Sequence, residues 1–262
     1  MSKLVFFRHM VIDNFDKIRK HLDFIDTKLD RYVVHILRRT KDISQGFKNA
    51  LGANEAQRLI KTYYIDSFEY FDRKREAIKE LCRANNARAY INVQPKDNFE
   101  CLLNLGEKIF ETIRNKNYSV KPEHLVRQAF CEWHKTRKKQ WIIDLDNDEM
   151  TEYFSDKNGH PNGSKTWTKE EVMALVKKEL EACGKDPTLA YSIPTKKGVH
   201  IITPPFNLMS AAKKCGMLFE GCKKIPVELH WTGLETYNIK HKQVTGWLHK
   251  DGMTLLFYEN NG

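Results

Sequence analysis

The sequence predicts an α+β protein: a helical N-terminal region, residues 1–84, followed by a mixed β-sheet core flanked by helices, residues 85–262. Two features carry this prediction. In the first third of the chain, apolar residues recur every three or four positions, as on the buried face of a helix. After that region, short segments rich in β-branched and aromatic residues alternate with amphipathic helical patterns, which is typical of an α+β core.

Helices are predicted over residues 13–42 and 54–86, separated by a break that contains Gly46 and Gly52. The first has the apolar spacing of one buried face. Its apolar positions are Phe15, Ile18, Leu22, Ile25, Leu29 and Val33. Asp13 or Asn14 is placed to cap its start.

The core begins with a strand in the segment ARAYINVQP, which ends at a proline, and continues with amphipathic helices over 98–117 and 121–140. WIIDLD follows as a strand, and residues 151–166 are predicted to be a polar loop. The next helix starts at a capping box made by Thr168 and Glu171 and ends at Gly184. Two apolar segments joined by a basic turn then span residues 188–206.

The last part of the chain is predicted to contain one more helix over 206–221 and three strands. The strand segments are IPVELHW, QVTGWLH and MTLLFYE. The pair Asp251-Gly252 indicates a hairpin turn between the last two. All the core strands are expected to form one mixed sheet.

Composition limits the class of protein. With 41% hydrophobic and 30% charged residues, the chain is globular rather than disordered. No apolar run approaches the roughly 20 residues of a membrane helix, so we expect a cytoplasmic protein without membrane contact. The six cysteines form no CxxC pair and are expected to be reduced thiols. Cys131 and His134 lack the second pair that a zinc site requires.

The net charge of +10 favours a polyanionic partner, and nucleic acid is the commonest. Basic residues occur in runs, for example Lys17–Lys20 and Lys135–Lys139. A single run is better explained by a solvated helix face. The prediction of a polyanionic partner therefore depends on all the basic runs together.

The stretch WIIDLDNDE carries the first candidate site. Strand side chains alternate, so Asp144 and Asp146 share one face while Ile143 and Leu145 share the other. Neighbouring carboxylates repel unless a cation or a proton lies between them, and Mg²⁺ or Mn²⁺ commonly uses one or two carboxylates plus substrate phosphates. The pattern predicts a metal site. A strand that runs into a solvated acidic turn is the simpler alternative.

Three chemistries use such an acidic pair. An EF-hand calcium loop is excluded, because its sixth position would be Glu149 instead of glycine and its twelfth Ser155 instead of glutamate. A phosphatase of the haloacid dehalogenase type is disfavoured, because its fifth position is Asp148 instead of threonine or valine. Metal-assisted phosphoryl or nucleotidyl transfer fits the pattern.

A second motif follows in YSIPTKKGVHIITPP. A basic turn that contains a glycine lets backbone N–H groups and lysines approach phosphate oxygens. The residues around this turn are Ser192, Thr195, Lys196 and Lys197. His200, on the strand that leaves the turn, is placed to donate a hydrogen bond to a triphosphate. A structural role in the core is equally open for this histidine.

Together, the DLD strand and KKGVHII resemble the first two motifs of the archaeo-eukaryotic primase (AEP) superfamily, which includes phage and plasmid primases and primase-polymerases. The resemblance covers about residues 85–258 and implies an AEP/RRM-like mixed sheet. It also implies that Asp144 and Asp146 bind the catalytic Mg²⁺ or Mn²⁺. His200 would contact the incoming nucleotide, helped by the residues of the basic turn.

The third motif of that family, an acidic residue on a further strand, has no clean counterpart here. Glu228 in IPVELHW is the best replacement, and Asp251 is a weaker one because a hairpin turn already explains it. If neither serves, the site has two carboxylates, and activity would be weak, altered or lost.

The resemblance implies a primase or primase-polymerase that joins nucleoside triphosphates on a single-stranded template. Aromatic residues of the N-terminal region are candidates for template stacking or for the core. They are Tyr63, Tyr64, Phe68, Tyr70 and Phe71. Two alternatives stay open: a catalytically impaired nucleic-acid-binding replication protein, and a metal-dependent nuclease or phosphatase. Helicase or other replication partners would be separate chains, and a phage origin would place the protein in the host cytoplasm.

Overall fold

The computed structural model describes residues 10–39, 58–131, 138–146, 149–155, 161–207, 210–211, 246–249 and 252–259. The fold is α+β, as predicted. The chain forms two compact units, the first containing Met1–Lys138 and Met253–Gly262, the second Lys139–Gly252. This division differs from the predicted boundary at residues 84 and 85, because strands from both sides of that boundary belong to one sheet.

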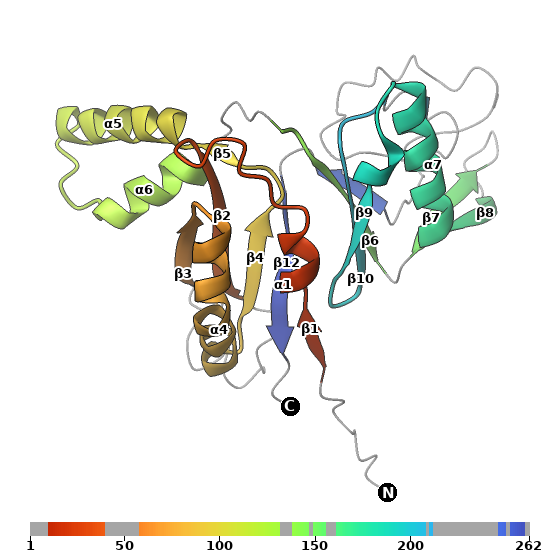
Figure 1. Cartoon of the computed structure of the whole chain (residues 1–262), viewed down its shortest axis with the longest axis horizontal. Helices are drawn as coiled ribbons and strands as arrows, with labels where there is room; N and C mark the ends of the chain where they lie inside the picture. The colour runs from red at the N-terminus through yellow and green to blue at the C-terminus, as the bar shows by residue number, and fades with distance from the viewer. Residues whose placement is uncertain are drawn as a thin grey trace, which may run out of the picture. The chain divides into compact units, whose positions relative to one another are not determined.

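The first unit is built on an antiparallel sheet. Its strands, in spatial order, are β1 (Val11–Asp13), β12 (Met253–Glu259), β4 (Arg88–Asn92), β2 (Asp30–Arg38) and β3 (Arg58–Ile65), and β5 (Lys96–Asp97) pairs with β2. Figure 1 shows the last strand of the chain, β12, lying between β1 and β4. The C-terminal segment is therefore an internal part of the first unit.

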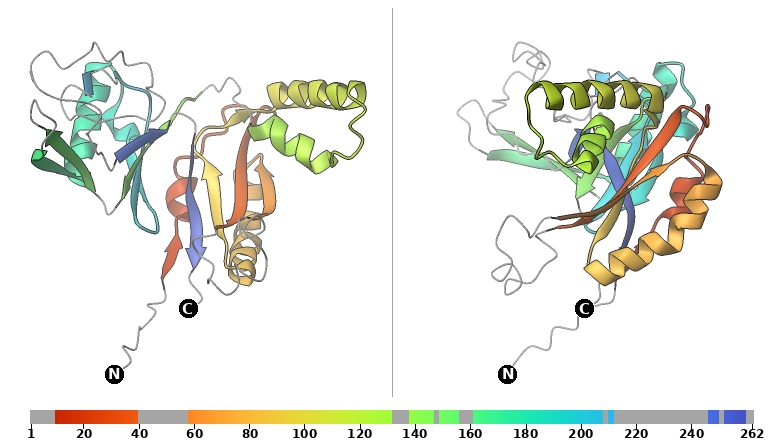
Figure 2. Two further views of the ribbon diagram at one scale, coloured as in Figure 1. Left: turned by 180° about the vertical axis from the view of Figure 1, so that it is seen from behind. Right: turned by 90° about the vertical axis from the view of Figure 1, so that its left-hand side faces the viewer.

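Helices cover both faces of this sheet (Figure 2). On one face lie α1 (Phe15–Arg19) and α4 (Phe68–Asn85), and α4 buries Phe71, Ile78 and Cys82. On the other lie α5 (Asn98–Arg114) and α6 (Pro122–Cys131). There Val33 of β2 packs with Cys101 of α5 and Phe130 of α6.

The predicted all-helical N-terminal region is wrong for β2 and β3. Strand β2 lies between two other strands and has helices on both sides, so consecutive residues from Tyr32 to Ile36 are buried. Such an apolar run has no period of two, and its spacing can imitate a helix. The β-branched residues Val33, Val34 and Ile36 favour the strand. The predicted helix is confirmed at α4, whereas α1 is only five residues long.

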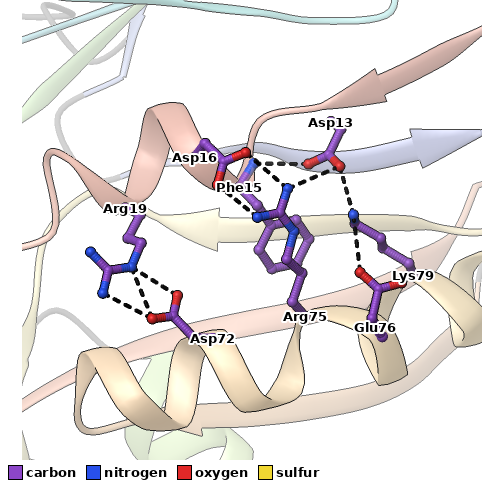
Figure 3. A network of polar contacts seen from close by, with 8 residues as sticks. All are labelled: Asp13, Phe15, Asp16, Arg19, Asp72, Arg75, Glu76 and Lys79. Carbon is purple, nitrogen blue, oxygen red and sulfur yellow. Dashed lines mark hydrogen bonds and ion pairs between the residues drawn. The ribbon is translucent and has the colours of Figure 1, made fainter.

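A network of ion pairs joins the start of the chain to α4 (Figure 3). Arg75 contacts Asp16 at 2.6 Å and Asp13 at 3.3 Å, and Lys79 contacts Asp13 at 2.7 Å. Asp13 also accepts a hydrogen bond from the backbone N–H of Phe15. Burial alone would raise the pKa of Asp13, but the hydrogen bonds from Lys79 and Phe15 and the charges of Lys79 and Arg75 hold it below its ordinary value.

The second unit contains a four-stranded antiparallel sheet. Its strands, in spatial order, are β11 (Gly246–His249), β6 (Trp141–Asp146), β10 (Gly198–Thr203) and β9 (Tyr191–Pro194). Helix α7 (Lys169–Ala182) packs on one face, and a single 3₁₀ turn, η2 (Pro187–Leu189), precedes β9. The predicted capping box of Thr168 and Glu171 is confirmed, and Gly184 follows the helix with a φ of +68°.

Two predictions for the second unit are wrong. The predicted polar loop is instead a hairpin of β7 (Glu149–Ser155) and β8 (Pro161–Thr168), whose threonine and aromatic residues favour strands. The predicted hairpin at Asp251-Gly252 does not form, because β11 pairs with β6 whereas β12 pairs with β1 and β4. The single mixed sheet is thus replaced, in the part of the chain described, by separate antiparallel sheets.

Candidate functional site

Strand β6 lies inside the sheet of the second unit, between β11 and β10. Its residues Ile143 and Leu145 pack in the core cluster that includes Val176 of α7. Because side chains alternate along a strand, Asp144 and Asp146 occupy positions on the opposite face. Because Ile143 and Leu145 are buried on one face, the two aspartates occupy positions together on the other face, as predicted.

The register of β6 and β10 brings the second motif to this face. His200 lies opposite Asp144, and Gly198 lies opposite Asp146. Residues opposite each other in an antiparallel pair share a face. The imidazole Nε2 of His200 is 3.3 Å from Oδ1 of Asp144, and their side chains are 14% and 34% exposed. His200 is thus not isolated in the apolar core: it contacts a carboxylate that reaches solvent.

The basic turn lies at the same end of the sheet as the acidic pair. Residues 195–197 connect β9 to β10, and the backbone N–H of Thr195 donates to the carbonyl of Gly198 at 2.7 Å. Lys197 in this turn is exposed and Lys196 is half-buried. Because Gly198 lies opposite Asp146, the turn brings two lysines to the strand end that carries the aspartates.

Ser192 does not join this group. It lies opposite Ile201, whose side chain is in the core cluster with α7. By strand alternation, Ser192 therefore occupies a position on the α7 face, away from His200. The predicted grouping of Ser192 with the turn is therefore wrong: the two are close along the chain, but closeness along the chain does not determine the face of the sheet.

The candidates for a third acidic residue, Glu228 and Asp251, lie outside the described residues, as does the side chain of Asp146. Within the described part, β11 is the other neighbour of β6, and it carries no acidic residue. No group of three or more histidine, cysteine, aspartate or glutamate side chains suited to a metal ion occurs among the residues with described positions.

Two further residues occupy positions on the candidate face and were missed from the sequence. Trp247 of β11 lies opposite Asp144, and His249 lies opposite Ile142. Their spacing of two residues in WLH is the signal that they share a face. What the sequence does not reveal is that β11 pairs with β6, because that contact joins segments about a hundred residues apart.

The donors at this site suit a hard divalent cation. Asp144 offers a solvent-accessible carboxylate, and Asp146 occupies the next position on the same face. One or two carboxylates are the usual protein contribution to a Mg²⁺ or Mn²⁺ site that also takes phosphate oxygens. The imidazole beside Asp144 and the lysines of the turn are suited to the phosphates themselves.

The aromatic residues considered for template stacking are largely part of the core. Tyr63 and Phe71 are buried. Tyr64 packs on Phe130 with ring centroids 4.5 Å apart, and Phe68 packs on Phe24 at 5.1 Å. These contacts explain their spacing without a bound nucleic acid.

Comparison with known proteins does not assign the chain: no family model, curated protein or solved structure matches it. In the described regions, none of the helices has the length and apolar character needed to cross a membrane.

Proposed function

We propose that the protein is a metal-dependent nucleotidyltransferase of the primase or primase-polymerase type, which joins nucleotides on a single-stranded template. The observation that carries the proposal is the pairing of β6 with β10. This pairing sets His200 opposite Asp144, with 3.3 Å between Nε2 and Oδ1, and sets the lysine turn beside Asp146. Acidic, imidazole and cationic groups at one strand end suit a nucleoside triphosphate with its metal ions.

Each residue has a distinct proposed role. Asp144 and Asp146 would hold Mg²⁺ or Mn²⁺, which stabilises negative charge on the attacking oxygen and the departing pyrophosphate. Once the metal ion holds Asp144, Nε2 of His200 would turn from that carboxylate to donate to a phosphate oxygen, which requires the tautomer or cation that carries a proton there. Lys196, Lys197 and the backbone of the turn would neutralise the remaining phosphate charge.

A third carboxylate from Glu228 or Asp251 remains part of the proposal. The absence of an acidic residue from β11 favours a second candidate, a primase-like protein that binds nucleic acid without polymerising. Both candidates use the same positively charged chain, whose net charge of +10 suits a polyanionic partner. The two candidates differ in the role of Asp144: polymerisation requires this carboxylate, whereas binding of nucleic acid does not.

The first test is primer synthesis and extension on a single-stranded DNA template, with labelled ribo- or deoxyribonucleotides and Mn²⁺ or Mg²⁺. The wild type is expected to produce oligonucleotides. Asp144→Asn and His200→Gln should each lower the rate by about 100-fold or more, because each removes charge stabilisation at the reacting phosphate. Asp186→Asn is the matched control, because Asp186 caps η2 and asparagine caps equally well.

The outcomes separate the candidates. Template binding without products, unchanged in Asp144→Asn, would favour the binding protein. Degradation of the template that depends on Asp144 would indicate a nuclease. Ser192→Ala tests the register itself: because Ser192 lies on the α7 face, this variant should keep wild-type activity, whereas Lys197→Ala should raise the KM for the nucleotide.

A further inference from the structure

Helix α5 presents an apolar face to solvent. Six large side chains of this face are between 41% and 69% exposed: Phe99, Leu102, Leu103, Ile109, Phe110 and Ile113. We call these six residues, with Gly106, the α5 stripe. Positions spaced three, four and seven residues apart lie on one side of a helix, so the stripe is continuous. Large exposed apolar patches mark interaction surfaces.

The opposite side of α5 fixes the helix to the first unit. Cys101 is fully buried and packs with Phe130 and Val126 of α6 and with Val33 of β2. Figures 1 and 2 show α5 as the outer helix of the α5–α6 pair. The stripe is therefore held on a packed element and does not face the core of its own unit.

The α5 stripe has an internal symmetry. Leu103 and Ile109 lie three residues on either side of Gly106, Leu102 and Phe110 lie four residues away, and Phe99 and Ile113 lie seven residues away. A two-fold axis through Gly106 would therefore place the stripe of one copy on the stripe of another, running antiparallel. Self-complementarity of this kind is what a two-fold interface requires.

Gly106 is suited to the centre of such a crossing. Among the described residues, a Cβ added there would meet no atom within 4 Å. No described contact therefore requires glycine, although glycine in a helix interior costs about 1 kcal/mol relative to alanine. A close approach of a second backbone would explain its presence.

The charges beside the stripe favour the same arrangement. Glu100 and Arg114 are fourteen residues apart, nearly four turns, so they lie on the same flank at opposite ends of α5. An antiparallel pair brings Glu100 of each copy near Arg114 of the other, whereas a parallel two-fold pair places the equivalent charges on opposite flanks, where they do not meet. The five charged residues of α5 sum to −1 in a chain of +10, which disfavours nucleic acid or an anionic lipid surface as the occupant.

We propose that two copies of this chain associate through α5, antiparallel and two-fold symmetric about Gly106. A helix of 17 residues is about 25 Å long. Covering one face of it in both copies buries roughly 1,000 Å², at the lower end of specific interfaces. The association is therefore a concentration-dependent equilibrium. It depends on no part of the proposed function.

Sedimentation velocity over a hundredfold range of concentration tests the association. The wild type should shift from monomer to dimer, and Leu102→Lys and Phe110→Lys should each raise the dissociation constant at least tenfold. Both sites are exposed, so the fold is kept. Ile25→Lys is the matched control, because Ile25 is 59% exposed but lies outside α5. A monomer at all concentrations, or a dimer insensitive to both α5 variants, would overturn the proposal.

Cysteine cross-linking tests the orientation, in a background that carries Cys131→Ser, Cys183→Ser, Cys215→Ser and Cys222→Ser and keeps only the buried Cys82 and Cys101. Gly106→Cys should form a disulfide-linked dimer by itself. Ile113→Cys should cross-link poorly alone but efficiently when mixed with Phe99→Cys. Efficient self-linking of Ile113→Cys would indicate parallel helices and contradict the two-fold arrangement. Flotation of the monomer with phosphatidylglycerol vesicles, if lost in Phe110→Lys, would assign the stripe to a lipid surface instead.

Discussion

His35 is a buried imidazole on β2, with 9% of its surface exposed. Its Nδ1 lies 2.9 Å from the hydroxyl of Thr62 on β3. Burial, and secondarily the positive charge of Arg127, lower the pKa of His35 from its ordinary value of 6.5 to about 4. The folded protein therefore keeps this side chain neutral under conditions in which the unfolded chain protonates it.

This difference predicts a pH dependence of stability. Between pH 6.5 and about 4, the unfolded chain binds more protons at His35 than the folded chain, so the free energy of unfolding falls as the pH is lowered through this window. Replacing the imidazole by His35→Gln keeps a polar partner for Thr62 but removes the titration. Urea unfolding at pH 7.5 and pH 5 should show a loss about 2 kcal/mol larger in the wild type.

The comparison of the two proteins cancels other titrating groups, such as His21, whose pKa burial also lowers. Equal losses of stability in wild type and variant would contradict the assignment of the effect to His35.

At the scale of single residues, local sequence patterns predict the acidic part of the candidate site. The alternation in WIIDLD is local, so the shared face of Asp144 and Asp146 follows from it. The pairing of Asp144 with His200 depends on two strands that are far apart in the chain, and the pattern within one strand does not identify the strand with which it pairs. The same reason explains why Ser192 was grouped with the wrong face.

At the scale of elements, the polar network of Figure 3 joins the first strand and helix to α4. Lys79 is nearly buried, with 10% of its side chain exposed, and it contacts two carboxylates, Asp13 at 2.7 Å and the more exposed Glu76 at 3.3 Å. Asp13→Asn should lower the free energy of unfolding by about 1–2 kcal/mol, because Lys79 loses the closer and less exposed of these two partners. Asp72→Asn is the matched control: Asp72 and Arg19 are 48% and 45% exposed, and exposed pairs contribute little.

Because folding lowers the pKa of Asp13, the stability difference between the wild type and Asp13→Asn should depend on pH. A carboxyl group whose pKa is lowered by folding contributes stability above its ordinary pKa of 3.8, and that contribution is lost as the pH falls through the lower, folded value. The wild type should therefore lose its advantage over Asp13→Asn below about pH 4. An advantage that persists unchanged to pH 2 in chemical denaturation would count against the network.

Some elements that the sequence predicts correctly have local start or stop signals. Helix α7 has a capping box, and the β9–β10 hairpin has a glycine-bearing turn. Strand β2 has neither signal, and its burial on both faces comes from partners elsewhere in the chain. The apolar residues of β2 have a helical spacing by coincidence. Its contacts with neighbouring strands and helices make it a strand.

At the scale of the whole molecule, the second unit is inserted into the first. The chain leaves the first unit after Lys138 and returns to it at Met253. On its return, β12 fills the position between β1 and β4, and its residues Leu255–Tyr258 are buried. Asn14, before α1, binds the carbonyls of Leu255 and Leu256 through its side chain and backbone N–H. Strand β12 thus completes the sheet to which β1, far away in the sequence, also belongs.

Removal of residues 253–262 should therefore unfold the first unit, although these residues are distant in sequence from most of it. The deletion exposes the edges of β1 and β4 and removes four consecutive buried side chains, each worth about 1.5–3 kcal/mol when apolar and fully buried. That sum is comparable to the whole stability of a domain. In ¹⁵N–¹H correlation spectra, signals of the first unit should collapse to unfolded positions, while those of the four-stranded sheet and α7 in the second unit should stay dispersed, because that unit is continuous in the chain. A deletion of residues 260–262 alone, beyond β12, serves as the control and should leave the spectrum native. A native spectrum after the longer deletion would contradict the prediction, because it would show that the first unit folds without β12.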